Sequence, residues 1–342
     1  MILTSCCRTA SNAFRFHTFA VVCSAVIGLQ QNSVAAQVPW TPEKTIEITV
    51  PGGAGGGIDT QARTVERILK SQRLVNMPIV IVNKSGGSAS IGLTYISQQA
   101  PDGLHIAMGS SALLTNHITG KSGLHYKDLT ALPQLAIESI SFSVKADSEI
   151  TSGKDLLERW GKDPASVRVG VPSVASSNHI AAALMVKAAG GDPKRLRTVV
   201  FNSSAGALTA LLGGHIDVVA SPALNTIPHL KRGALRVVAV TAPKRLSGDL
   251  SAIPTAREFG ADVVIGAYRS VLGPKGMSPE AIAYWDSTFA RMVETQGWRE
   301  FMQKNSWEDN FMPSTESATF MKARYDAFKS VLAELGLVKG AP

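Results

Sequence analysis

The sequence has little cysteine, and none of it lies beyond the first 36 residues. The three cysteines are Cys6, Cys7 and Cys23. If this segment is removed during export, the remaining chain carries no thiol. A chain without thiols can form no disulfide bond and cannot use cysteine as a nucleophile, so both possibilities are excluded for the exported product.

Long hydrophobic runs are also missing after residue 36. The one marked apolar run covers residues 19–29, follows Arg8 and Arg15, and precedes the small residues 33–36. This order of basic, apolar and small-residue regions is typical of a secretory signal and predicts cleavage after Ala36. An apolar run this short does not span a bilayer, which disfavours a membrane anchor. We therefore expect residues 1–36 to be a signal peptide and the remaining chain to be periplasmic.

Motifs for cofactors, metals and nucleic acids are absent from the sequence. The glycine-rich stretch at residues 52–57 does not fit the GxGxxG spacing, and no GxxxxGK[ST] motif occurs. The histidines show no HxH or HExxH spacing, so no metal site is supported. The formal net charge of +8 is spread along the chain without a block of basic residues and interleaved aromatics. We expect no cofactor, no metal and no nucleic-acid partner.

What the chain does contain is a repeated pattern of apolar segment, small polar turn and amphipathic segment. The predicted strands of the first part are residues 46–50, 78–82 and 104–108, and predicted helices cover 58–74 and 91–99. The continuous apolar run at residues 78–82 predicts a buried parallel strand. This alternation predicts an α/β fold with a parallel sheet. In such sheets ligands bind beyond the carboxyl ends of the strands, where the glycine and serine turns lie.

The same pattern recurs after residue 141, and the chain then crosses back to the first lobe. Residues 139–144 are interpreted as a crossing into a second lobe, and residues 263–272 as the crossing back. We therefore predict one lobe from residues 37–141 and 268–342, and another from residues 142–267. Predicted helices at 279–296, 298–305 and 314–335 would pack on the first lobe. Two crossing strands would form a hinge that allows the lobes to close around a ligand.

The loop from Val50 to Asp59 contains five glycines before a predicted helix. Glycine lets the backbone adopt positive φ and approach a bound group closely. The unpaired N–H groups of a helix start attract anions. Serine turns at residues 173–178 and 203–206 repeat this arrangement in the second part. The pattern favours a protein that binds a small anion over an enzyme.

Several short motifs, in this order, resemble the solute-binding proteins of tripartite tricarboxylate transporters, the Bug family. They are the loop at residues 50–59, Asn83-Lys84-Ser85-Gly86-Gly87, Pro101-Asp102-Gly103, residues 170–179, Ser204-Ala205-Gly206-Ala207-Leu208 and Ile253-Pro254-Thr255-Ala256. The resemblance implies a type II periplasmic-binding-protein fold with two Rossmann-like lobes. It also implies a small carboxylate ligand held in the interlobe cleft by N–H groups, hydroxyls and water.

The resemblance also implies which residues contact the ligand. In the first lobe these are Gly55, Gly56, Gly57 and Asp59, and in the second lobe Ser173, Ala175, Ser176 and Ser177, with Ser203 and Ser204 nearby. From the small polar turns themselves we also predict contact by Ser88, Ser110 and Asn178. Tyr268 and Arg269 lie in the returning crossing and complete the predicted site.

Some of these residues have alternative roles. Asp59 at a helix start interacts favourably with the helix dipole, or it faces the cleft and selects ligands that carry an amine or hydroxyl. Ser176 and Ser177 exceed what helix capping needs, so we expect anion contact for at least one. Arg269 either forms a structural ion pair or binds a carboxylate bidentately.

The predicted function is capture of a small carboxylate and its delivery, by a monomer, to the small and large membrane subunits of a tripartite transporter. Two alternatives stay open. One is an orphan sensor that feeds a signalling system. The other is a serine hydrolase using Ser204, although the sequence has no G-x-S-x-G motif.

Overall fold

The computed structural model describes residues 40–201 and 203–340. The predicted signal peptide lies outside the described residues. The strands are β1 (Ile46–Val50), β2 (Ile79–Asn83), β3 (His105–Ser110), β4 (Leu129–Lys145), β5 (Arg168–Val171), β6 (Arg197–Val200), β7 (Val218–Pro222), β8 (Leu235–Val240), β9 (Gly266–Pro274) and β10 (Glu308–Met312). No described helix is both long and apolar enough to cross a membrane.

Ten α-helices connect or follow these strands in the described ranges. They are α1 (Gly57–Ser71), α2 (Ser90–Ser97), α3 (Ala112–Ile118), α4 (Gly153–Lys162), α5 (Ser177–Ala188), α6 (Ser204–Leu212), α7 (Ile227–Lys231), α8 (Pro279–Val293), α9 (Gln296–Asn305) and α10 (Ser314–Glu334). A 3₁₀ turn, η1 (Gly87–Ala89), precedes α2. The alternation of strands and helices confirms the predicted α/β class.

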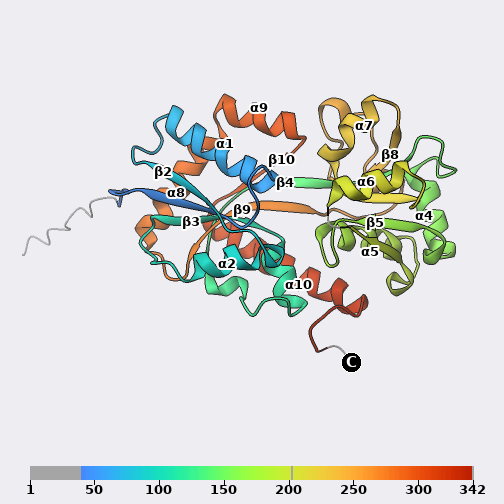
Figure 1. Cartoon of the computed structure of the whole chain (residues 1–342), viewed down its shortest axis with the longest axis horizontal. Helices are drawn as coiled ribbons and strands as arrows, with labels where there is room; N and C mark the ends of the chain where they lie inside the picture. Colours follow the sequence, from blue (N-terminus) through green and yellow to red (C-terminus); the bar gives the residue numbers. More distant parts are fainter. Residues whose placement is uncertain (1–39, 202, 341–342) are drawn as a thin grey trace, which may run out of the picture. The chain divides into compact units, whose positions relative to one another are not determined.

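The strands pair in the order β2-β1-β3-β9-β4-β7-β5-β6, with β8 and β10 also on β4 (Figure 1). β1 is parallel to β2 and β3, and β5 is parallel to β6 and β7. β9 runs antiparallel to both β3 and β4. Each set of parallel strands is therefore built by the predicted strand–turn–helix repeat, with the turns at the carboxyl ends.

β4 carries the chain from one set of strands to the other. Residues 129–139 pair with β9, whereas residues 140–145 pair with β7 and β8. Only its second half was predicted as a strand. The first half contains Pro133, where the register shifts, and such irregularity hides the alternation of apolar and polar residues. β10 was not predicted because the polar residues 308–310 give it no strand pattern.

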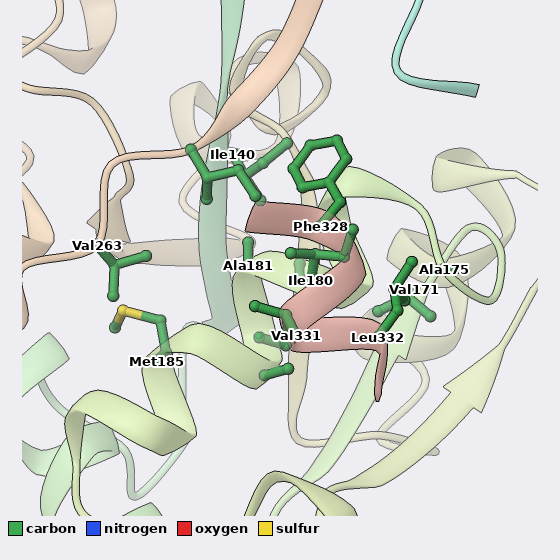
Figure 2. Packing of buried hydrophobic residues seen from close by; sticks show 14 of the residues in the cluster. Ile140, Val171, Ala175, Ile180, Ala181, Met185, Val263, Phe328, Val331 and Leu332 are labelled. Atoms are coloured by element: carbon green, nitrogen blue, oxygen red, sulfur yellow. The ribbon is translucent and has the colours of Figure 1, made fainter. Parts of the chain in front are cut away.

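One further expectation is corrected. β2 was predicted to be buried, yet it lies at the sheet edge and Val80 is 48% exposed. The helix now named α10 was expected to pack on the first lobe. It contacts α3 and β4, but Phe328, Val331 and Leu332 also pack in one buried cluster with Ile180 of α5 (Figure 2). Its apolar residues thus join elements from both parts of the chain.

Candidate functional site

A cavity of about 180 Å³ lies where the turns after β3 and β5 meet β9. We call it the serine cavity. Its walls come from η1, from the end of β3 with α3, from the turn between β5 and α5, and from β9. The lining residues are Ser88, Ser110, Ser111, Ala112, Thr115, Asn116, Lys121, Ser173, Val174, Ser176, Ser177, Asn178, Ala267 and Arg269.

Most of the described residues that line the serine cavity are polar, and none of them is acidic. Seven of its side chains are hydroxyls, two are amides and two are the cations Lys121 and Arg269. Hydroxyls and amides can donate hydrogen bonds, and cations attract an anion in a site of restricted solvent access. An arrangement without acidic groups favours a negatively charged occupant over a cationic one.

The first turn of α5 adds backbone donors. Ser176 is the N-cap, because its Oγ accepts a hydrogen bond from the His179 N–H at 3.3 Å. The same hydroxyl donates to the Ser173 carbonyl at 2.8 Å. The N–H groups of Ser177 and Asn178 occupy first-turn positions, for which the helix itself supplies no acceptor. The cavity therefore has backbone N–H groups that an anion can use.

Hydroxyl and amide contacts connect the walls. Ser177 Oγ donates to Ser111 Oγ at 3.0 Å, which joins the start of α5 to the end of β3. The Asn116 amide of α3 donates to the Ser88 carbonyl at 2.8 Å and to Ser90 Oγ at 3.1 Å. Ser88 and Ala89 have φ of 53° and 78°, a region that costs free energy for residues with a side chain. Asn116 thus helps to hold a strained turn at the cavity edge.

Arg269 lines the serine cavity but already has an acidic partner. Its guanidinium forms an ion pair and hydrogen bond with Glu138 and lies 5.2 Å from the Trp307 ring centroid. The Arg269 and Glu138 side chains are only 14% and 7% exposed. The predicted structural ion pair is therefore present. Its Nε atom is buried, with no acceptor in the described part of the chain.

The glycine loop lies apart from these residues. Gly56 caps α1 and Gly57 begins it, one residue before the predicted start, but no loop residue lines the serine cavity. Asp59 accepts hydrogen bonds from Gly55 N–H at 2.8 Å, Arg63 Nε at 2.9 Å and Asn83 Nδ2 at 2.9 Å. The hydrogen bond from Arg63 is the main cause that lowers the Asp59 pKa to about 2. Asp59 is thus engaged by its own loop, by α1 and by β2.

Four other predicted residues also lie outside the cavity lining. Ser203 caps α6 by accepting a hydrogen bond from Gly206 N–H at 3.1 Å, and Ser204 follows it. Tyr268 is buried against Phe320, and burial raises its pKa. Ala175 is buried beneath the serine turn. These four residues do not line the serine cavity, and their contact with a ligand stays a prediction.

The structure therefore brings together Ser88, Ser110, Ser173, Ser176, Ser177, Asn178 and Arg269. Sequence reasoning missed Thr115, Asn116 and Lys121, which lie on or just after α3. Ser111, next to the predicted Ser110, was not among the predicted contacts. The signal available was the small polar turn at residues 109–111, which follows the predicted strand 104–108. Only the helical geometry shows that Asn116 faces the turn at Ser88.

Solved structures share this fold. A ligand-free TctC solute binding protein from Polaromonas gives a TM-score of 0.74 at 25% identity, covering 86% of this chain and 99% of that chain. An R. palustris protein solved with adipate gives 0.73 at 23% identity, covering 87% and 99%. A UPF0065 protein in the gbd 5' region of Cupriavidus necator is 25% identical over 318 residues, which cover 92% of this chain and 95% of that protein.

The family model described as the tripartite tricarboxylate transporter family receptor matches residues 62–337. This range covers most of the chain and every residue that lines the serine cavity, but begins after the glycine loop. The similar structure from Polaromonas is that of a solute-binding protein. The chain therefore belongs to the tripartite tricarboxylate transporter receptor family.

Proposed function

We propose that this chain is a periplasmic receptor that binds a small carboxylate in the serine cavity and delivers it to a tripartite membrane transporter. One observation carries the proposal. The cavity combines seven hydroxyls, two cations and the first turn of α5, and none of its described lining residues is acidic. A carboxylate matches this set because each of its oxygens accepts hydrogen bonds from N–H and O–H donors.

The cavity has room for a small ligand. Its volume of about 180 Å³ corresponds to roughly six water molecules at about 30 Å³ each. The R. palustris protein of the same fold was solved with adipate, which makes adipate a sensible first probe.

Binding and release would involve hinge motion. We assign residues 37–141 and 268–342 to one lobe and residues 142–267 to the other, with β4 and the segment before β9 as the hinge. In support, the pairing partners of β4 change between residues 139 and 140. The Ser111–Ser177 hydroxyl contact would then close the cavity across the two lobes. The receptor would act as an exported monomer after removal of residues 1–36.

The test is a thermal-shift series with acetate, succinate, adipate, malate and citrate. Any carboxylate that binds the native state raises its stability, by about 2.7 kcal/mol at a concentration of 100 Kd. We expect at least one of these acids to stabilise the protein, and each acid to be recovered unchanged. If none of them stabilises the protein, or if one is chemically converted, the proposed function is wrong.

A further inference from the structure

The turn between β5 and α5 has an unusual backbone conformation. It supplies Ser173, Val174 and Ser176 to the serine cavity, but between them Ala175 adopts φ of 60°. A residue with a Cβ pays free energy in this left-handed region, so the surrounding structure must hold it there. The Ala175 side chain is buried and packs in the cluster with Val171 (Figure 2). Packing alone does not fix the direction of its N–H group.

His179, one helical turn further on, binds that N–H group. The Ala175 N–H donates to His179 Nδ1 at 3.1 Å. Because a peptide N–H can only donate, Nδ1 must be unprotonated, and the ring proton therefore lies on Nε2. Nε2 is 3.3 Å from Thr198 Oγ1 on β6, and this hydroxyl oxygen can accept a hydrogen bond from the Nε2–H group. Both ring nitrogens thus have partners, and the ring orientation is determined.

The backbone of His179 reaches the same turn. Its N–H donates to Ser176 Oγ, and Ser176 Oγ donates in turn to the Ser173 carbonyl. His179 is 6% exposed and is not among the residues that line the serine cavity. Burial lowers its pKa to about 4, so the ring stays neutral at neutral pH and keeps its acceptor. One residue therefore holds the turn at Ala175 and at Ser176.

We propose that His179 is a positioning residue for ligand binding: its Nδ1 holds Ala175 in the left-handed conformation and thereby directs Ser173, Ser176 and the first turn of α5 into the serine cavity. The proposal rests on the proposed function, because it assigns a role to a residue behind the binding surface. His179 itself does not touch the ligand. Ligand binding requires the hydrogen-bond acceptor at Nδ1 more than it requires the volume of the imidazole ring.

Two amide variants separate the Nδ1 acceptor from the volume of the ring. In His179→Asn, the amide oxygen can take the place of Nδ1 and accept from Ala175. In His179→Gln, the amide nitrogen can take the place of Nε2 and reach Thr198, but nothing replaces Nδ1. Both variants lose the buried ring, so their thermal unfolding serves as the matched control for general damage.

The readouts are hydrogen exchange of the Ala175 amide in the free proteins and the Kd for adipate by calorimetry. We expect His179→Asn to keep the amide protected and to bind within about threefold of wild type, and His179→Gln to lose protection and bind about tenfold more weakly. Equal behaviour of the two variants in both readouts would overturn the proposal. If wild type binds no acid of the series, the proposed function fails, while amide exchange still decides whether Nδ1 holds the turn.

Discussion

Ser176 and Ser203 are N-cap residues of α5 and α6, and they provide a matched comparison at the residue scale. Each hydroxyl accepts one hydrogen bond from the third residue of its helix. Only Ser176 lines the serine cavity. We expect Ser176→Ala and Ser203→Ala each to lower the free energy of unfolding by about 1 kcal/mol. Only Ser176→Ala should also weaken carboxylate binding, as measured by calorimetry.

The opposite result would place the ligand elsewhere. If Ser203→Ala weakened binding and Ser176→Ala did not, the ligand would lie beside α6, as the sequence also suggested. Chemical unfolding of both variants shows whether the two caps are energetically equivalent, so a change in affinity can be separated from a change in stability.

The Glu138–Arg269 pair leads to a second prediction at this scale. Glu138 neutralises a guanidinium that lines the cavity, so its negative charge opposes any bound anion. In Glu138→Gln the amide oxygen can still accept from Arg269 while the charge is removed. We expect affinity for adipate to rise by about threefold to tenfold, and the gain to shrink with added salt.

Arg269→Met is the companion variant. It removes the cavity cation and leaves Glu138 buried without its partner, which should destabilise the fold by about 3 kcal/mol or more. Adipate affinity should fall in this variant. Unchanged affinity in both variants would show that Arg269 has only a structural role, one of the two roles that the sequence left open.

His179 gives a third prediction, about pH. Its pKa is about 4 in the folded chain, because burial disfavours the charged ring, against about 6.5 in the unfolded chain. As the pH falls below 6.5, the unfolded state takes up the proton first, so the free energy of unfolding decreases. Between pH 7 and pH 5 this loss amounts to roughly 2 kcal/mol.

Urea unfolding at pH 7 and pH 5 measures this loss. Wild type should lose more stability than His179→Asn, which has no group titrating in this range at that position. An equal loss in the two proteins would mean that other groups cause the acid sensitivity. Asp59 does not interfere, because its folded pKa of about 2 and its ordinary value of 3.8 both lie below pH 5.

At the scale of elements, the predictable parts were those with an unbroken pattern. β1 was predicted with its observed bounds, because apolar and polar residues alternate along it without interruption. α10 was predicted to within one residue at its end. The first half of β4 was missed because Pro133 lies at a register shift. The α/β order therefore follows from local sequence, whereas irregular strands depend on pairing partners that are distant in sequence.

The same limit applies to the candidate site. The serines of the turn at residues 173–178 were predicted because they follow a clear strand and begin a helix. Tyr268 and Arg269 were both predicted, but neighbours in a strand point to opposite faces, so only Arg269 lines the cavity. The glycine loop has the features of an anion site, yet Asp59 occupies its Gly55 N–H group. Local sequence could not show that this donor is already used.

At the scale of the whole molecule, the question is whether the two proposed lobes must separate for a ligand to enter. All three cysteines of the chain lie in residues 1–36, so Ser111→Cys and Ser177→Cys together would introduce the only thiols of the exported product. The two hydroxyl oxygens are 3.0 Å apart, which brings the side chains close enough to test a cross-link. A disulfide here would join the end of β3 to the start of α5.

We expect the oxidised double variant to bind adipate far more slowly than its reduced form, because the cross-link prevents hinge opening and so closes the route into the cavity. Stopped-flow fluorescence before and after reduction measures the two rates on one protein. The reduced form is the control for the loss of both hydroxyls, and free-thiol titration confirms that the bond has formed. Equal association rates would contradict the hinge, since a cavity that fills while β3 and α5 are joined needs no separation of the lobes.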